Sequence, residues 1–442
     1  MTLATRPGHT GPIIRLAAPI AIAQLAQVAT GTTDTVFLGG LGADALAAGG
    51  LGTTLFITVL VVLQGVLSGA SVLMARAIGA GQRNALPGLY WAGMGLSVFL
   101  SLPAFLLFSY AEPLFLAIHE PPALARNIAD FLAVLRWGLP GGLISMGLMR
   151  AVMPALGVGQ MLLWVAVPGA VVNAGLAWVL IYGTGPVPGF GMVGAAGATA
   201  IEMTGAAVVL VVLLHRRAGL RDSVRWRRPV WVTVRAILSI GIPTAGIAAV
   251  ESGLFLATGL LVATLGPLEL AAQQVALNVV TLSFMVPLAL AQAAHVRVAG
   301  LLGAGNRAGA RRAGWTAIAL GFVTEAVPAI AIAIAPSVVV GWYLGGSSPA
   351  ATAIAAGLLS VFVFQIVDGI QCAALGALRG FGDTRTPFLI AAAGYWGAGF
   401  PLAWVLTHAG WGALGAWCGL AVGLAVVAGA LIWRFRVVSS RH

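Results

Sequence analysis

Acidic side chains interrupt several long apolar segments of this 442-residue sequence. Five of the 12 acidic residues lie in such segments, namely Asp34, Glu202, Glu251, Glu325 and Asp368. A charged side chain in the middle of an apolar segment that crosses a membrane costs about 2.5 to 3.5 kcal/mol, so acids in these positions usually face a cavity and carry a function. The sequence therefore predicts that its chemistry is concentrated at these carboxyl groups.

Amide side chains accompany Glu251 and Asp368, the two acids near the middle of second-half segments. Asp368 has glutamines three residues to either side, of which Gln365 is the first. Gln274 and Asn278 are four residues apart on the segment after Glu251, so they share one helical face. Such a cluster can hold a monovalent cation such as Na⁺ through oxygen ligands at Glu251 and Asp368. It can also carry protons, and both uses describe a coupling-ion site; the alternative is a structural hydrogen-bond network.

The first half of the chain repeats in the second half after a shift of 224 residues. This shift places Pro19 on Pro243 and Gly79-Ala80-Gly81 on Gly303-Ala304-Gly305 without a gap. The period is too long for a solenoid repeat. Both copies are strongly apolar, so the repeat predicts two bundles of membrane helices. Secondary transporters have this architecture and bind cargo where the repeats meet.

The polar residues do not follow the repeat. Gln27 occupies the position that corresponds to Glu251, and Asp34 lies seven residues further along the same helical face. Asp34 is therefore a candidate proton or cation site of the first half, or else part of a solvated cavity wall. Glu202 and Glu325 stand alone among small and apolar residues, so we expect each to line a cavity or to make an interhelical hydrogen bond rather than to couple an ion.

Composition assigns the chain to the integral membrane proteins. Hydrophobic residues make up 60% of it and charged residues only 8%, against about a quarter charged in soluble proteins. A membrane-crossing helix needs about 20 apolar residues. The sequence thus predicts an all-α protein with twelve transmembrane helices in two pseudo-symmetric six-helix bundles. The expected helices cover residues 13–38, 46–76, 90–111, 128–153, 161–183 and 193–214, then 234–264, 270–300, 314–335, 352–378, 386–407 and 411–434.

The 23 basic residues are all arginine, and they are concentrated in every second loop between the predicted membrane helices. One set of loops and the two termini hold 21 of them, which by the positive-inside rule predicts an even number of crossings with both termini in the cytoplasm. The net charge of +11 therefore reflects topology, and we expect no nucleic-acid partner. An arginine-rich linker, 215–233, separates a first bundle, 1–214, from a second, 234–442, and can contact lipid headgroups.

Motifs across nearly the whole chain make it similar to the multidrug and toxic compound extrusion (MATE) family, and within that family to the NorM type. In the first half the resemblance rests on Ala18-Pro19-Ile20, on Asp34-Thr35-Val36 with Gly39 and Gly42, on Gly79-Ala80-Gly81, and on Asn173 with Ile181-Tyr182-Gly183. In the second half it rests on Glu251, on residues 271–278 (Ala-Ala-Gln-Gln-Val-Ala-Leu-Asn), on Arg297 with Gly303, and on Asp368 with residues 378–384 (Leu-Arg-Gly-Phe-Gly-Asp-Thr).

The resemblance implies a two-lobed antiporter in a bacterial cytoplasmic membrane that exchanges Na⁺ or H⁺ for bulky, often cationic aromatic compounds, including antibiotics. By the same resemblance Glu251, Asp368 and Asn278 form the ion site of the second lobe. Asp34, with Asn173, belongs to a proton or substrate site of the first lobe. It implies a monomer without a cofactor beyond the coupling ion. Phe364 stands where NorM-type members usually carry a tyrosine, and the choice between Na⁺ and H⁺ stays open.

Two other functions fit the sequence less well. A flippase for lipids or lipid-linked precursors would also use a two-lobed bundle, but such proteins usually have further membrane helices or a basic central cavity. An integral membrane enzyme would need a catalytic constellation, whereas the six histidines are scattered and the two cysteines show no metal or redox spacing. We therefore expect a transporter and not an enzyme.

Overall fold

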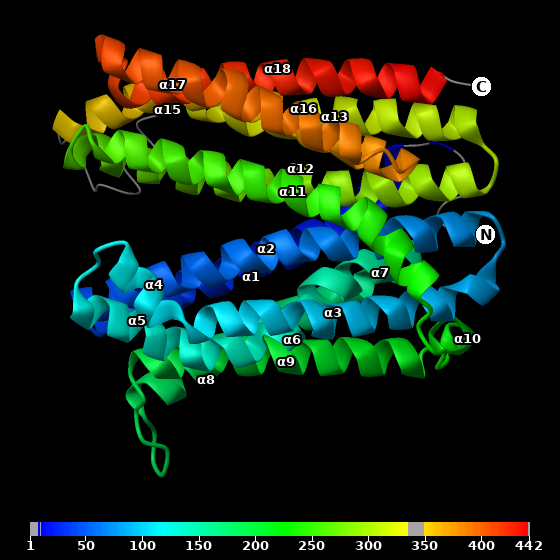
Figure 1. Cartoon of the computed structure of the whole chain (residues 1–442), viewed down its shortest axis with the longest axis horizontal. Helices are drawn as coiled ribbons and strands as arrows, with labels where there is room; N and C mark the ends of the chain where they lie inside the picture. Colours follow the sequence, from blue (N-terminus) through cyan, green and yellow to red (C-terminus); the bar gives the residue numbers. More distant parts are fainter. Residues whose placement is uncertain (1–7, 9, 335–348, 441–442) are drawn as a thin grey trace. The chain divides into compact units, whose positions relative to one another are not determined.

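A computed structural model describes residue 8, residues 10–334 and residues 349–440; within these ranges the side chains of 267, 268, 271 and 349–360 are left aside. Residue 335, the predicted end of the ninth crossing, and the first seven residues of the predicted first bundle lie outside the described residues. Every regular element in the described part is helical (Figure 1), which confirms the predicted fold class. A single β-bridge, Thr184 to Val187, occurs in a loop.

Eleven helical runs in the described residues are long and apolar enough to cross a membrane. The last run, Arg385–Ser440, has 56 residues, far more than the roughly 20 that one crossing needs. Two glycines in left-handed conformations break it, Gly410 with φ 91° and Gly412 with φ 56°. After this break the chain folds back, so that α16 (Arg385–Gly394) and α17 (Phe400–Leu406) pack along α18 (Gly412–Ser440) (Figure 1). The run therefore supplies two crossings, so the described residues contain the twelve crossings that the sequence predicts.

The helices group into two compact units, Ile22–Ala245 and Met1–Ala21 with Gly246–His442, named here the N-terminal and the C-terminal unit. The sequence interpretation places the boundary between the bundles at the linker 215–233. The two dividing points of the structure lie inside α1 and α11. They are also 224 residues apart and follow Pro19 and Pro243 by two residues. Both copies of the repeat thus divide at the same position.

Close glycine contacts explain why the beginning of α11 belongs to the N-terminal unit. A Cβ added to Gly69 of α2 would lie 2.3 Å from the carbonyl oxygen of Ile237, and one added to Gly241 would lie 2.0 Å from that of Val66. Only glycine allows two helix backbones to approach so closely. The other division falls inside α1, whose beginning belongs to the C-terminal unit. There Arg297 donates a 2.9 Å hydrogen bond to the carbonyl oxygen of Gly8, near the start of the chain.

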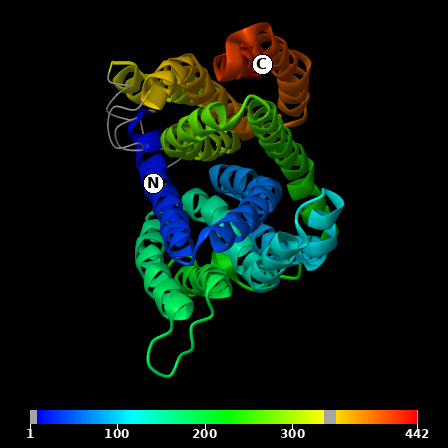
Figure 2. The same ribbon diagram turned by 90° about the vertical axis from the view of Figure 1, so that its left-hand side faces the viewer.

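The N-terminal unit contains the helices between Ile22 and Ala245, which form a bundle when viewed close to end-on (Figure 2). In it α8 packs against α9, and α2 against α5. Its elements are α1 (Thr10–Gly40, from Ile22 on), α2 (Ala43–Gly79), α3 (Leu86–Ser109), α4 (Ala111–Ala117), α5 (Pro122–Leu135), α6 (Leu139–Gly142), a π-helical stretch (Leu143–Met149), α7 (Arg150–Ala155), α8 (Gln160–Tyr182), α9 (Met192–Arg216), α10 (Arg221–Val224) and the first part of α11 (Trp231–Ala263).

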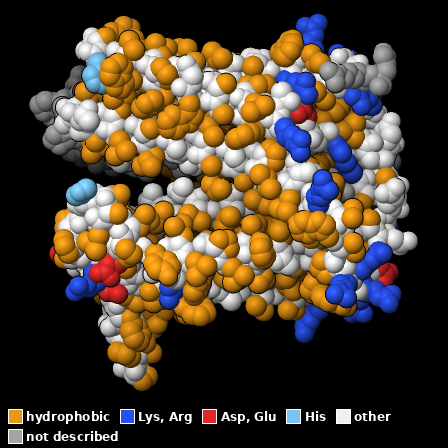
Figure 3. Space-filling model, viewed as in Figure 1, with side chains coloured by type: hydrophobic (Ala, Val, Ile, Leu, Met, Phe, Trp, Pro, Cys, Tyr) orange, Lys and Arg blue, Asp and Glu red, His pale blue; other side chains and the backbone are white. Residues whose placement is uncertain are grey.

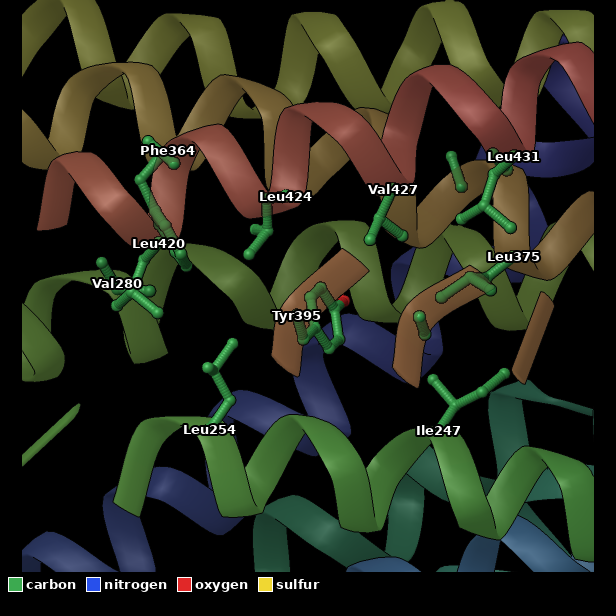
Figure 4. Close-up of a cluster of buried hydrophobic side chains, with 14 of the residues drawn as sticks. Ile247, Leu254, Val280, Phe364, Leu375, Tyr395, Leu420, Leu424, Val427 and Leu431 are labelled. Atoms are coloured by element: carbon green, nitrogen blue, oxygen red, sulfur yellow. The ribbon is translucent and has the colours of Figure 1, made fainter. Parts of the chain in front are cut away.

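The C-terminal unit is built around α15, which packs against α12, α13 and α18. A buried apolar cluster holds these helices together, and Figure 4 shows Phe364, Leu424 and Tyr395 within it. The further elements of this unit are α12 (Pro267–Gly303), α13 (Arg307–Ile334), α15 (Pro349–Phe381) and a π-helical turn (Tyr395–Gly399) between α16 and α17.

The backbone repeats as the sequence does. Gly42, before α2, has φ 115°, and its counterpart Gly266, before α12, has φ 119°. Gly81 and Gly305 follow the same two helices with φ 72° and 74°. Residues with a Cβ rarely adopt these conformations, so glycine is needed at both copies of each turn. Within each unit, the arginine side chains visible in Figure 3 gather mainly at one end of the helices, as the positive-inside rule predicts.

Candidate functional site

Glu251 lies in the second part of α11, inside the C-terminal unit. Its helix is held against the π-helical turn at Tyr395–Gly399 because Trp396 Nε1 donates a 3.3 Å hydrogen bond to the carbonyl oxygen of Val250, the residue before it. Gly253 adds to this contact, since a Cβ there would lie 3.4 Å from the Trp396 ring. Local packing therefore directs Glu251 toward the elements around Tyr395.

Asp368 of α15 is only 5% exposed, and its carboxyl group interacts electrostatically with two other acids. One is Glu251 of α11, as the sequence predicts, and the other is Glu325 of α13. Three acids from three helices thus gather in the C-terminal unit. In the described residues, no arginine comes within 4.0 Å of them, since the ion pairs at that distance are Arg126 with Glu112 and Arg434 with Asp383.

Tyr395 supplies a hydroxyl group to this acidic cluster. Its phenol interacts electrostatically with both Glu251 and Asp368 and accepts a hydrogen bond from the buried amide of Gln371. Phe364, by contrast, is fully buried in apolar contact with Phe255 and Trp417. The phenolic oxygen near the acids therefore comes from the π-helical turn of the eleventh crossing and not from α15.

The amides predicted around the acids take two different positions. Gln365 is buried, and its side-chain nitrogen donates a hydrogen bond to Ser283 of α12, whose hydroxyl also interacts with Glu325. Asn278 and Gln274 are exposed on α12. The amide that α12 buries is that of the neighbouring Gln273, at 1% exposure.

A second polar cluster lies in the N-terminal unit, around Asp34 of α1. The Thr199 hydroxyl of α9 donates a 2.9 Å hydrogen bond to Asp34 Oδ2. Asn173 of α8, completely buried, donates a 3.4 Å hydrogen bond to the same hydroxyl. Three helices thus converge on Asp34 through Thr199.

Gln27 of α1 belongs to a neighbouring group that contains a cation. Its Oε1 accepts a 2.9 Å hydrogen bond from Arg150 of α7, and its Nε2 contacts Met146 Sδ at 3.3 Å. Arg150 interacts electrostatically with Glu202 of α9, and Glu202 in turn with Asp34. The N-terminal cluster therefore combines two acids with an internal guanidinium.

Several residues of these clusters escaped the sequence interpretation. Thr199 precedes Glu202 by one helical turn, a spacing that could have marked it. Arg150 lies inside the predicted segment 128–153, near its end, and is one of the 21 arginines that the loop distribution assigns to the cytoplasmic side. Ser283 and Tyr395 show no signal in the sequence, because their partners lie on other helices.

The side chains of the C-terminal cluster limit which ligands a bound ion could have. In the part of the chain that the structure describes, no three side chains of His, Cys, Asp or Glu stand close enough together to hold a metal ion. A bound Na⁺ would therefore need amide, hydroxyl or carbonyl oxygens beside the carboxylates, which are the ligands that hard cations prefer. Buried oxygens of this kind are present on Gln365 and Gln371.

Twelve membrane crossings, a duplicated scaffold and acidic clusters inside both copies define a membrane transporter. The chain belongs to the MATE family: the family model described as MatE matches residues 19–179 and again residues 243–405. The two matches begin at Pro19 and Pro243, the same pair that relates the two copies of the repeat. The resemblance stated from the motifs is therefore confirmed, as is the expectation of a transporter rather than an enzyme.

The chain is similar to curated relatives over nearly its whole length. It is 50% identical to the probable multidrug resistance protein NorM of Burkholderia mallei, over 97% of this chain and 92% of the relative. It is 49% identical to the multidrug resistance protein NorM of Burkholderia vietnamiensis, over 98% and 95%.

Solved structures share the fold at low sequence identity. The eukaryotic MATE transporter AtDTX14 superposes with a TM-score of 0.88 at 22% identity, over 98% of this chain and 97% of that one. An outward-facing multidrug resistance MATE transporter of the MOP superfamily superposes with a TM-score of 0.89 at 21% identity, over 100% and 98%. Multi-pass membrane insertion follows from the fold and from the apolar helices.

Proposed function

We propose that this protein is a multidrug efflux antiporter, which exports bulky and often cationic aromatic compounds in exchange for Na⁺ or H⁺. The observation that carries the proposal is the interaction of Glu251, Asp368 and Tyr395 inside the C-terminal unit. The names of the relatives, which are multidrug resistance proteins, support the choice of cargo. We further propose that the protein works as a monomer in the bacterial inner membrane with both termini in the cytoplasm.

The coupling mechanism follows from the cost of buried charge. An ionised carboxyl group in a low-dielectric interior is unfavourable unless a counter-charge accompanies it. Binding of Na⁺ or H⁺ offsets negative charge on Glu251 and Asp368 and so favours the state in which they are sealed from water. Release of the ion favours the other state, in which the cargo leaves. An ion and a cargo can drive such an exchange only if each binds the two states with different affinity.

The N-terminal cluster is proposed to serve the cargo or a proton. Asp34 provides a negative charge that attracts a cationic compound, and Thr199 and Asn173 hold its carboxyl group in position. Glu202 lies near enough to influence the charge of Asp34, so the two acids act together.

The proposal is tested by transport of a fluorescent organic cation into or out of proteoliposomes. The purified protein is given a Na⁺ gradient alone and then a proton gradient alone, and one of the two should drive uphill transport. Glu251→Gln and Asp368→Asn should each slow ion-driven transport at least tenfold, a change of about 1.4 kcal/mol. Asp130→Asn, at an exposed acid of α5 outside both clusters, is the matched control. Ion-driven transport at the wild-type rate in both cluster variants would refute the proposed coupling site.

A further inference from the structure

Glu325 is an acid inside a membrane-crossing helix that the proposed ion pair of Glu251 and Asp368 does not include. It lies on α13 and is 1% exposed, so its carboxyl group contacts neither lipid nor bulk water. An acid buried to this degree in a membrane helix is rarely retained without a function.

Two glycines bring Glu325 next to Asp368. A Cβ on Gly369, the residue after Asp368, would lie 2.3 Å from the carbonyl oxygen of Gly321 and 2.7 Å from Cγ of Glu325. A Cβ on Gly321, one turn before Glu325, would lie 2.4 Å from the carbonyl oxygen of Gly369. The backbones of α13 and α15 therefore touch at this level, and the side chain of Glu325 occupies the space that the missing Cβ of Gly369 leaves.

The surroundings of Glu325 are shared with Asp368. Ser283 of α12 interacts with the Glu325 carboxyl group and accepts a hydrogen bond from Gln365, three residues before Asp368. Asp368 interacts electrostatically with Glu325 as well as with Glu251. The three carboxyl groups are thus parts of one network and not separate features of the unit.

Buried side-chain oxygens that lack a hydrogen-bond partner indicate which ligand this network can bind. Gln365 and Gln371 are each 1% exposed, and each leaves its side-chain oxygen without a hydrogen-bond partner among the described residues. Oδ1 of Asp368 likewise has no partner there. A buried acceptor without a donor is unfavourable by about 1 to 3 kcal/mol. Two amide oxygens in addition to three carboxyl groups are the ligands that a hard cation prefers.

We propose that Glu325 is a third carboxyl group of the coupling site and adds one monovalent cation to the number that this site exchanges in each transport cycle. The proposal rests on the proposed function, since it extends the site at Glu251 and Asp368. Its physical basis is charge balance: three buried negative charges require more positive charge than a single Na⁺ or H⁺ provides. No ion pair within 4.0 Å supplies that charge in the described part of the chain.

The number of exchanged ions is measured from the point of zero net flux in proteoliposomes. With the membrane potential held at zero, the cargo gradient that just stops transport equals the ion gradient raised to the number of ions per cargo. Separate series use Na⁺ and H⁺ as the driving ion. We expect an exponent of at least two for the wild-type protein, and an exponent lower by one for Glu325→Gln, which keeps the shape of the side chain and removes its charge.

Gly369→Ala provides a second variant that keeps the acid but displaces it. The added methyl group would lie 2.7 Å from Cγ of Glu325 and 2.3 Å from the carbonyl oxygen of Gly321, so it pushes α13 and its acid away from α15. If it folds, this variant should show the same lowered exponent. Gly429→Ala is the control, because nothing lies within 4 Å of a Cβ at that position of α18, and its exponent should equal that of the wild type. Size-exclusion profiles establish that each variant is folded before its exponent is compared.

The outcomes separate this inference from the function on which it rests. If the wild-type protein shows no ion-driven transport, the proposed function itself fails. If the wild type is ion-driven with an exponent of one, or if folded Glu325→Gln keeps the wild-type exponent, only the inference about Glu325 is overturned. A wild-type exponent of one overturns the inference without any variant, whereas an exponent of two or more supports it only together with the lowered exponent of folded Glu325→Gln.

Discussion

Arg150 is a positive charge inside the N-terminal unit, at the first residue of α7. It binds Gln27, the residue that occupies the place of Glu251 in the repeat, and it interacts with Glu202. Where the C-terminal unit gathers three acids, the N-terminal unit therefore balances two acids with an arginine. The two copies of the scaffold differ in charge at the level of single residues, and this difference predicts that exchangeable cations bind in the C-terminal unit.

We predict that Arg150 and Glu202 stabilise the protein as a pair. Arg150→Leu removes the positive partner of Glu202 and leaves that acid beside Asp34, so the unfolding temperature should fall. Glu202→Gln introduced into the Arg150→Leu protein should recover part of the loss, with an interaction energy of about 0.5 to 3 kcal/mol in a double-mutant cycle. Tryptophan fluorescence during heating measures each variant.

The surface pair of Arg126 and Glu112 is the control for this cycle. Their side chains are 72% and 43% exposed at a separation of 3.8 Å, and exposed pairs contribute about 0 to 1 kcal/mol. Strictly additive effects of Arg150→Leu and Glu202→Gln would show that the two residues do not act as a pair.

Helix contacts in both units depend on glycine. In the N-terminal unit, Gly141 of α6 faces the backbone of α9, and a Cβ there would lie 2.6 Å from Cα of Thr204. In the C-terminal unit, Gly321 and Gly369 serve the same purpose between α13 and α15. Membrane helices lack a hydrophobic driving force between them, so close packing of small residues is a main source of their association.

We predict that Gly141→Ala destabilises the N-terminal unit, because its methyl group meets backbone atoms of α9 that cannot move aside. Overpacking of this kind costs about 1 to 3 kcal/mol. The apparent unfolding temperature in detergent, followed by size-exclusion chromatography after heating, should fall by several degrees. Gly205→Ala, where a Cβ meets nothing within 4 Å, should leave it unchanged. Equal unfolding temperatures for the two variants would contradict the proposed contact.

At the scale of the whole molecule, the distribution of arginines indicates the membrane topology. Seven of them lie between 215 and 235, where the chain passes from one copy of the repeat to the other. The turn at Thr184–Val187, between α8 and α9, contains none. Only α9 crosses the membrane between these two loops, so they lie on opposite sides, and the arginine distribution predicts that the loop 215–235 is the cytoplasmic one.

Labelling with a membrane-impermeant maleimide tests this topology. Cysteine is introduced by Thr184→Cys or by Arg228→Cys, both at exposed positions, after Cys418→Ala has removed the native cysteine that is not buried. Intact bacterial cells should label the protein with Thr184→Cys, whereas Arg228→Cys should react only after the membrane is opened. Labelling of both in intact cells would exclude the predicted orientation.

The sequence by itself determined the membrane class, the number of crossings, the repeat and the family. The number of crossings can be read from the order of residues along the chain, because the thickness of the hydrocarbon core sets the length of each apolar segment. The loop arginines set the direction in which each segment crosses. The repeat and the family motifs are likewise patterns in the order of residues. It also singled out Glu251, Asp368 and Asp34, because an acid in an apolar segment is conspicuous whatever its neighbours are.

Only the tertiary structure decided which polar groups meet. The sequence predicted that Glu325 lines a cavity or makes an interhelical hydrogen bond, but it could not show that the contact of Gly321 with Gly369 places this acid beside Asp368. The role of Asn278 as a ligand stays a prediction, and the structure shows that the amide buried on α12 is that of Gln273. The physical reason is that lipid and protein interior are both apolar. A membrane helix is therefore hydrophobic on all sides, its periodicity does not reveal which face is turned inward, and that face is set by close packing with helices distant in sequence.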